Sequence, residues 1–361
     1  MKKSALTLAA GALLASSAYA QSSSVTLYGI ADVSVRYTTN SNAKNDGQFQ
    51  MTDGAVTQSR WGLKGAEDLG NNLKAIFQLE NGYSIDTGAK NDSSRLFNRQ
   101  AYVGLAGDFG TVKLGRQYTE GFNFFGDFDP LTIGNYTANA WPFFLTQFRR
   151  DNVISYSGAF GGLNVGASYG FGEQPGSITT NQYWGTRASY SMGPFAVGGV
   201  YQEIRDINGN KQQMWGASGK YGIGPAKLFL GYIGGKDRTG IIDNGFMNAD
   251  ASISGNRVPA GGNFQNNPRK DTAGFLGVTY QATPALALTG VFYADHITNV
   301  NGVSNNAGNR YTGVLLAEYS LSKRTQLYGT VDYNKVTGGA VTELPGRNNQ
   351  LGVATGIRHI F

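Results

Sequence analysis

The sequence predicts an all-β protein, folded as a closed, antiparallel transmembrane β-barrel of sixteen strands. Three observations support this fold class. Segments of alternating apolar and polar residues recur along the chain, which is typical of strands with one face toward water. The 52 glycines among 361 residues are about twice the usual share of about 7%, as many turns require. Short and long connections alternate between the segments.

The alternation defines sixteen candidate strands. Within one of them, Leu73 and Phe77 share a face, and Lys74 and Gln78 share the opposite face. Apolar residues outside and polar residues inside are the opposite of the arrangement in a soluble barrel. This arrangement suits a wall between lipid and water. The candidate strands lie near 25–37, 56–66, 72–82, 95–106, 109–118, 151–158, 163–171, 182–192, 194–205, 211–222, 225–235, 270–281, 285–297, 309–320, 324–335 and 349–361.

The connections between these strands separate into seven short and eight long ones. Gly222–Pro225 is a short turn, whereas 38–55, 119–150 and 236–269 are long loops. Outer-membrane barrels have short periplasmic turns and long external loops. A soluble β-sandwich does not require all of its long loops at one end. Both termini fall on the short-turn side, so the first strand can pair with the last. Closure is expected because hydrocarbon offers no partner to an open sheet edge.

The first twenty residues have the pattern of a secretory signal. Lys2 and Lys3 precede an apolar stretch over 5–14, and Ala18-Tyr19-Ala20 predicts cleavage before Gln21. We therefore expect a signal peptide over 1–20 and one barrel over 21–361. No later run approaches the roughly 18 apolar residues that a membrane-spanning helix needs.

Charge and composition argue against several classes of partner. Without the signal, the formal charge falls from +6 to +4, and no block of Lys and Arg forms a surface for nucleic acid. The absence of cysteine excludes disulfides, and His296 and His359 alone cannot assemble a Cys/His metal cluster. We expect no metal, no cofactor and no nucleic-acid partner.

Three motifs suggest catalysis, and each has a simpler explanation. Gly166–Gly170 matches the G-x-S-x-G pattern, but it lies within an alternating strand with no helix after it. The neighbours Asp295 and His296 lack a paired nucleophile. Asp127 and Asp129 suit an acid/base pair or a calcium ligand, yet a solvated or pore-facing loop explains them as well. We do not expect an enzyme.

The loop over 119–150 is rich in Phe, Trp and Pro, so we expect it to fold into the barrel. Its acidic residues would then face a basic row on the wall, giving a transverse field across a narrow aqueous gap. The alternative is a set of scattered, solvated charges, and Arg187 and Arg358 fit that alternative. The loop acids are Glu120, Asp127 and Asp129, and the basic row comprises Arg36, Arg60, Lys74, Arg99, Arg149 and Arg150.

Several segments carry a resemblance to a known family. They are SSSVTLYGIADV, SRWGLKGAEDLGNNLKAIFQLE, GTVKLGRQY, NVISYSGAFGGLNVGASYG, LSKRTQLYGTVDY and GVATGIRHIF. The chain resembles the general porins of Gram-negative bacteria, in the branch of β-proteobacteria and neisseriae. The resemblance implies a homotrimer in outer-membrane lipid, with one water-filled pore per subunit and a third loop that narrows it. Ions and small hydrophilic solutes would diffuse passively, with anions preferred.

The resemblance also implies roles for individual residues. The family's constriction arginines map onto Arg60, Arg99 and Arg149, with Arg150 an ambiguous neighbour. The terminal Phe361 is similar to the aromatic signal of barrel assembly. A substrate-specific channel is the main rival hypothesis, and it would need an aromatic slide along the lumen. An outer-membrane hydrolase and a soluble β-sandwich binding protein are two further hypotheses.

Arg116 is expected at a subunit contact. It shares parity with the outward Val112 and Leu114, and an arginine facing lipid near mid-bilayer costs about 2–4 kcal/mol. Such a residue needs a protein partner. Asp86 or Asp92 of an adjacent subunit is the expected source of a carboxylate.

Overall fold

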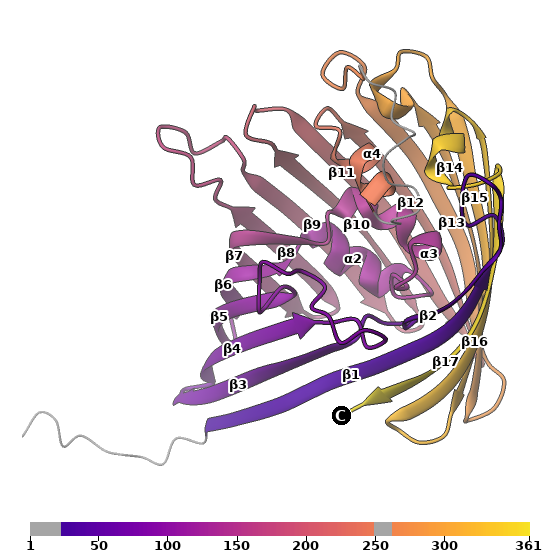
Figure 1. Cartoon of the computed structure of the whole chain (residues 1–361). Helices are drawn as coiled ribbons and strands as arrows, with labels where there is room; N and C mark the ends of the chain where they lie inside the picture. The colour runs from indigo at the N-terminus through magenta and orange to yellow at the C-terminus, as the bar shows by residue number, and fades with distance from the viewer. Residues whose placement is uncertain (1–22, 249–261) are drawn as a thin grey trace, which may run out of the picture.

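The computed structural model describes residues 23–248 and 262–361 as one antiparallel sheet curved into a barrel (Figure 1). Strand β1 (Ser23–Thr38) pairs with β17 (Asn349–Ile360), from Ile30 opposite Ile360 to Thr38 opposite Gly352. That pairing closes the sheet, so the hydrocarbon meets no open edge. Within the described ranges, no helix is both long and apolar enough to cross a membrane. The signal expected over 1–20 lies outside the described residues.

The barrel has the predicted sixteen strands, although the second is divided in two. β2 pairs with β1 along Val33–Thr38, and β3 pairs with it along Ser23–Ile30, so together they occupy the place of one strand. The strands after β1 are β2 (Gln48–Asp53), β3 (Arg60–Gly70), β4 (Leu73–Gly82), β5 (Gln100–Gly107), β6 (Gly110–Tyr118), β7 (Arg149–Phe160), β8 (Leu163–Gly170), β9 (Tyr183–Met192), β10 (Phe195–Arg205), β11 (Lys211–Ile223), β12 (Ala226–Asp237), β13 (Arg269–Gln281), β14 (Leu286–Thr298), β15 (Gly308–Ser320), β16 (Thr325–Gly338) and β17.

Side-chain hydrogen bonds explain where two strand boundaries differ from the prediction. The strand expected over 56–66 is interrupted because Asp32 holds a bend, accepting from Thr57 N at 2.9 Å through its carboxylate. Gly54 fits this bend because an added Cβ would overlap the Asp32 carboxylate. The strand expected over 95–106 begins only at Gln100. There the side chain of Asn98 bonds the backbone of Gly82, through its N at 2.8 Å and its O at 2.9 Å.

The outer wall is apolar, as the alternation predicted. Leu230 of β12 and Leu276 of β13 lie opposite each other and are 64% and 62% exposed. Their neighbours Phe229 and Phe275 point to the other face and are buried. An exposed apolar wall around buried inward positions suits contact with lipid.

The interior of the barrel contains the loop between β6 and β7, as predicted (Figure 1). This loop forms α2 (Glu120–Phe128), α3 (Thr137–Ala140) and the 3₁₀ helix η1 (Trp141–Thr146). Thr119 caps α2 by accepting from Phe122 N at 3.2 Å. The other helices are α4 (Ile241–Asn248), η2 (Val300–Gly302) and η3 (Gly339–Glu343), all in long loops.

Candidate functional site

The infolded loop is anchored to one side of the barrel. Helix α2 packs on β9, β10 and β11, where Phe124 and Phe125 are buried. Trp141 donates its indole N–H to Thr312 of β15 at 2.9 Å. Asp129 accepts from the Tyr293 hydroxyl of β14 at 2.6 Å, and from Ile133 N at 2.8 Å. An aqueous gap therefore remains between the loop and the opposite wall, which β3 to β7 form.

That gap is a cavity of about 480 Å³, which we call the constriction cavity. Its wall side carries three arginines among polar and two aliphatic side chains. Its loop side is largely apolar. The wall side comprises Ile30, Val56, Thr57, Gln58, Arg60, Arg99, Tyr118 and Arg149, and the loop side includes Phe122, Ile133, Asn135, Ala140, Phe144 and Phe148.

Only one of the three arginines of the cavity is paired with a carboxylate in the part of the chain that the structure describes. Arg99 donates from Nε to Glu80 at 2.7 Å and from Nη2 to the Tyr118 hydroxyl at 2.6 Å. Arg60 donates from Nε to the Gln58 carbonyl at 3.1 Å. The guanidinium of Arg149 lies over the Tyr118 ring, 4.8 Å from its centroid. Among the described residues, neither Arg60 nor Arg149 forms an ion pair with a carboxylate. The cavity therefore has a surplus of positive charge.

A barrel with an infolded loop and a basic gap fits one family in particular. Residues 5–339 match the model of the family described as Gram-negative porin. The chain belongs to this family. It is an outer-membrane porin, a channel for passive diffusion of ions and small hydrophilic solutes.

Individual relatives agree with the family. An outer membrane porin protein of Bordetella pertussis is 31% identical, and the match covers 100% of both chains. Outer membrane porin protein 32 of Delftia acidovorans is 29% identical, again over 100% of both chains. The solved anion-selective porin from Comamonas acidovorans has a TM-score of 0.74 and 26% identity, and the match covers 94% of this chain and 100% of that one.

The acidic residues of the porin's loop do not face the arginines of the constriction cavity, contrary to the prediction. Glu120 pairs with Arg187 of β9 at 2.8 Å. Asp129 is buried in the loop anchor, where burial raises its pKa to about 6. Burial also raises the pKa of Glu120, although Arg187 opposes this. The expected transverse field from loop acids to these arginines is therefore absent from the described residues, because the loop turns its acids toward the wall on which it packs.

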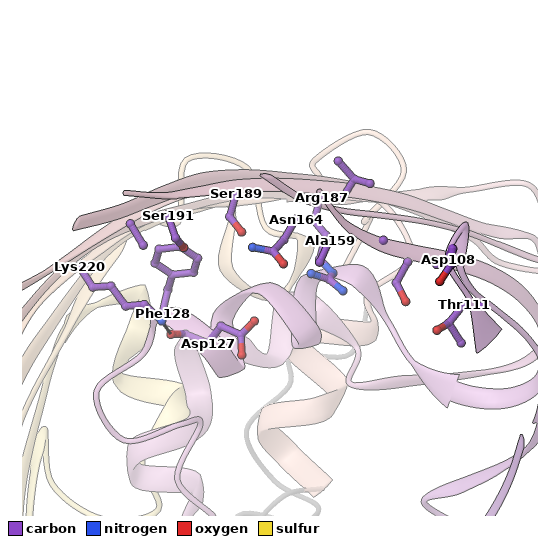
Figure 2. A pocket seen from close by; sticks show the side chains of 16 residues that line it. Asp108, Thr111, Asp127, Phe128, Ala159, Asn164, Arg187, Ser189, Ser191 and Lys220 are labelled. Carbon is purple, nitrogen blue, oxygen red and sulfur yellow. Dashed lines mark hydrogen bonds between the residues drawn. The ribbon is translucent and has the colours of Figure 1, made fainter. Parts of the chain in front are cut away.

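Asp127 instead lines a second cavity, of about 670 Å³, shown in Figure 2. Its side chain lies in the same cavity as Arg187 and Lys220, and Lys220 donates to the Asp127 carbonyl at 2.8 Å. Asp108 also lines it, near the short turn between β5 and β6. Acidic and basic groups are balanced here, unlike in the constriction cavity.

Three residues of the predicted basic row lie elsewhere. Arg36 is buried, pairs with Asp332 at 2.9 Å and supports the Tyr136 ring of the loop from 4.0 Å. Lys74 is exposed near the short turn that joins β3 to β4. Arg150 lines a neighbouring cavity of about 390 Å³ with Arg95, Arg116 and Arg149, and Arg149 lines both cavities. Parity predicted the face of a strand, but not the height along it or the partner across the barrel.

Arg116 does not need a carboxylate from a neighbouring subunit. Asp151 of the same chain pairs with it at 2.5 Å, and the carbonyl of Asn98 accepts from its Nε at 2.8 Å. Asp151 therefore occupies the place that the prediction gave to Asp86 or Asp92 of an adjacent subunit, and the subunit contact itself stays a prediction. At the other end of the chain, Phe361 joins the sheet, since its N donates to Gly29 O at 3.0 Å.

The sequence pattern did not indicate the ring cluster of the constriction cavity, formed by Tyr118, Phe122, Phe144 and Phe148. Tyr118 and Phe122 are stacked with centroids 4.6 Å apart. Phe148 lies edge-on to Phe122 at 5.6 Å and to Phe144 at 5.8 Å. The density of phenylalanine in the loop was visible, but its orientation toward the gap depends on how the loop folds back.

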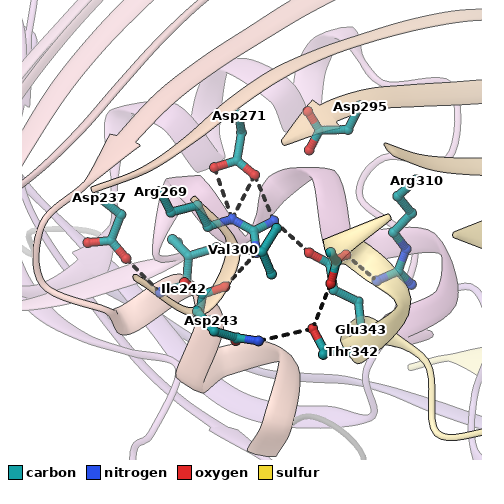
Figure 3. A network of polar contacts seen from close by, with 12 residues as sticks. Asp237, Ile242, Asp243, Arg269, Asp271, Asp295, Val300, Arg310, Thr342 and Glu343 are labelled. Carbon is teal, nitrogen blue, oxygen red and sulfur yellow. Dashed lines mark hydrogen bonds and ion pairs between the residues drawn. The ribbon is translucent and has the colours of Figure 1, made fainter. Parts of the chain in front are cut away.

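A buried ionic cluster at the long-loop end of the barrel, shown in Figure 3, was not predicted either. Arg269 pairs with Asp243 of α4 at 2.8 Å, with Asp271 at 2.7 Å and with Glu343 of η3 at 2.7 Å. Arg310 pairs with the same Glu343 at 3.1 Å. This cluster joins two external loops to the wall. Its members lie far apart in the sequence, so no local pattern indicates it.

Proposed function

We propose that this porin prefers anions and that Arg60, Arg99 and Arg149 set the preference. The observation that carries the proposal is the charge balance of the constriction cavity, three guanidinium groups against the single carboxylate of Glu80. No acidic residue is among those that line it on the loop side. A guanidinium stays protonated at any working pH. Every solute that passes this gap meets a positive wall.

The preference has to come from this local field. Without the signal expected over 1–20, a formal charge of only +4 is spread over a large barrel. Charges are screened over about 10 Å at 0.1 M salt. Charges that line the gap lie within this distance of a passing ion and act on it. Charges on the distant surface lie beyond it, and salt screens their effect. The similar solved porin from Comamonas acidovorans is described as anion-selective, which agrees with the proposal.

We further propose that the chain works as a homotrimer in outer-membrane lipid. Membership of the porin family supports this assembly, and a solved outer membrane protein of similar fold, OmpT of Vibrio cholerae, is described as a trimer form. Arg116, held by Asp151 of its own chain, remains a proposed contact residue. Phe361 remains the proposed assembly signal, and its side chain is 43% exposed.

We propose no catalytic role for the motifs that suggested one. Ser168 is hydrogen-bonded to the Tyr183 hydroxyl at 3.0 Å. The ring of His296 bonds Asn309 at 2.9 Å, and Asp295 accepts from Thr272 N at 2.9 Å. Ser168 also bonds the Glu120 carboxylate, but Arg187 pairs with that carboxylate, and these contacts do not bring His296 to the serine as a base.

The zero-current potential of single pores in a planar bilayer tests the anion preference. With a KCl gradient centred near 0.1 M, we expect the sign of chloride preference. The preference should weaken near 1 M, where the screening length is about 3 Å. A potential near zero, or one with the sign of potassium preference at low salt, would refute the proposal.

A further inference from the structure

The two faces of the constriction cavity differ in chemistry, and this difference has a consequence for the solutes that it holds. The arginine wall attracts any anion. The loop wall presents partly buried apolar side chains, including Ile133, Phe144 and Phe148, which pack on the core cluster beneath them. Apolar and aromatic side chains that line a cavity beside a few convergent charged groups are typical of small-molecule binding sites. An inorganic anion makes no use of this face.

We infer that the constriction cavity is a transient binding site for aromatic carboxylates. This inference rests on the proposed anion preference and names the solute class that the same site favours. An aromatic carboxylate matches both walls of the cavity. Its carboxylate can bind the guanidinium groups through charge-assisted hydrogen bonds, and its ring can pack on the rings of the loop wall.

The carboxylate end of the solute has two arginines to bind. Arg60 and Arg149 form no ion pair with a carboxylate among the described residues, while Arg99 is already held by Glu80. An arriving carboxylate therefore meets donors that do not first have to leave another carboxylate.

The ring end of the solute has the ring cluster beside those donors. Arg149 lies over both Tyr118 and Phe122, with the Phe122 centroid at 5.7 Å, and Phe148 and Phe144 extend the cluster into the loop. A volume of about 480 Å³ falls within the range of about 300–1,000 Å³ that is typical of small-molecule sites. A benzene ring with one carboxylate fits within that space.

Benzoate and acetate provide the test, because they carry the same charge and only benzoate has a ring. Purified protein in a planar bilayer conducts KCl while either anion is added, and the fall in chloride current is measured. We expect benzoate to reduce the current half-maximally at about 5-fold lower concentration than acetate, the factor expected from one ring contact.

Two variants locate the effect. Phe144→Ala should remove most of the difference between benzoate and acetate. Phe49→Ala is the matched control, since Phe49 is 78% exposed on β2 and does not line the cavity, and it should keep the difference. A difference that persists in Phe144→Ala overturns the assignment to this ring wall.

The wild-type measurement separates this inference from the proposal beneath it and needs no variant. Equal inhibition by benzoate and acetate in a pore that prefers chloride overturns the inference alone. A wild-type pore without chloride preference overturns the proposed function instead, whatever the two organic anions do.

Discussion

Two groups of arginines in this porin differ in how their charge is balanced. In the ionic cluster at the external end, Arg269 is fully buried and bonds Asp243, Asp271 and Glu343. In the constriction cavity, Arg60 and Arg149 have no carboxylate in ion-pair contact among the described residues. The same side chain thus has two uses. With carboxylates around it, it connects loops to the wall, and without them it supplies a field to the pore.

The comparison shows that a count of arginines cannot identify a pore site. Arg36 points inward and was expected in the constriction, yet Asp332 neutralises it and Tyr136 covers it. Burying charged groups costs desolvation, which the attraction within an ion pair only roughly offsets. Removing one partner leaves an unpaired buried charge, so the main effect is a loss of stability. Uncompensated arginines at a water-filled gap keep their charge available to solutes.

The largest expected effect comes from the compensated group. Arg269→Met leaves three buried carboxylates without their shared cation, and breaking such a cluster typically costs about 3–5 kcal/mol. We expect a clearly lower temperature of unfolding in detergent. Arg60→Met, the same substitution in the constriction cavity, should change that temperature little. Equal loss in both variants would show that the two groups do not differ as described.

A smaller effect is expected from the anchor that keeps the loop across the barrel. Asp129→Ala leaves the Tyr293 hydroxyl and two backbone N–H groups without their acceptor, at a typical cost of about 1–3 kcal/mol. The loop should loosen, and single-pore conductance should rise with more current noise. Asp129→Asn retains an acceptor and a donor of the same shape and is the control. Unchanged conductance in Asp129→Ala would show that the other loop contacts suffice.

The same anchor has a pH dependence with a definite sign. Burial raises the pKa of Asp129 to about 6 from 3.8, so the folded state binds this proton more tightly than the unfolded state does. Its contribution to stability is therefore fully present below about pH 4 and falls as the pH rises to about 6. Asn resembles the protonated carboxyl, so the unfolding temperatures of wild type and Asp129→Asn should be similar below about pH 4. Above about pH 6 the wild type should unfold at the lower temperature. Parallel pH profiles would exclude Asp129 as their cause.

The smallest effect comes from turning a compensated arginine into an uncompensated one. Glu120→Gln removes the negative charge beside Arg187 but keeps a hydrogen-bond acceptor at that position. Because Arg187 lines the cavity of Figure 2, its charge then becomes available to passing anions. The zero-current potential should move modestly further toward chloride preference. A shift toward potassium would contradict the link between compensation and selectivity.

The fold was predictable from the sequence because a strand's faces follow from a period of two. Parity placed Arg60 inward, and the alternation of short and long connections predicted closure. The bend at residues 54–59 was not predictable, since it depends on the Asp32 side chain, 25 residues from Thr57. Turn chemistry of this kind leaves no periodic signal.

The site was only partly predictable, because partners across a barrel are set by register and loop path. Arg36 and Asp332 are 296 residues apart and meet only after the sheet closes. Likewise, the sequence indicated an infolded loop but not which way its side chains turn. Glu120 and Asp129 were therefore expected to face the arginines, whereas they anchor the loop to the opposite wall.

The zero-current potential of the double variant Arg60→Gln/Arg149→Gln tests whether the arginines without a carboxylate set the anion preference. Both arginines lack a carboxylate in ion-pair contact among the described residues, and Arg99 is retained so that Glu80 keeps its partner. Lys74→Gln is the matched control, because it removes an inward positive charge that does not line the constriction cavity. In a KCl gradient near 0.1 M, the account predicts that the double variant loses most of its chloride preference and still conducts, while Lys74→Gln keeps it. A double variant as anion-preferring as the wild type would contradict the account.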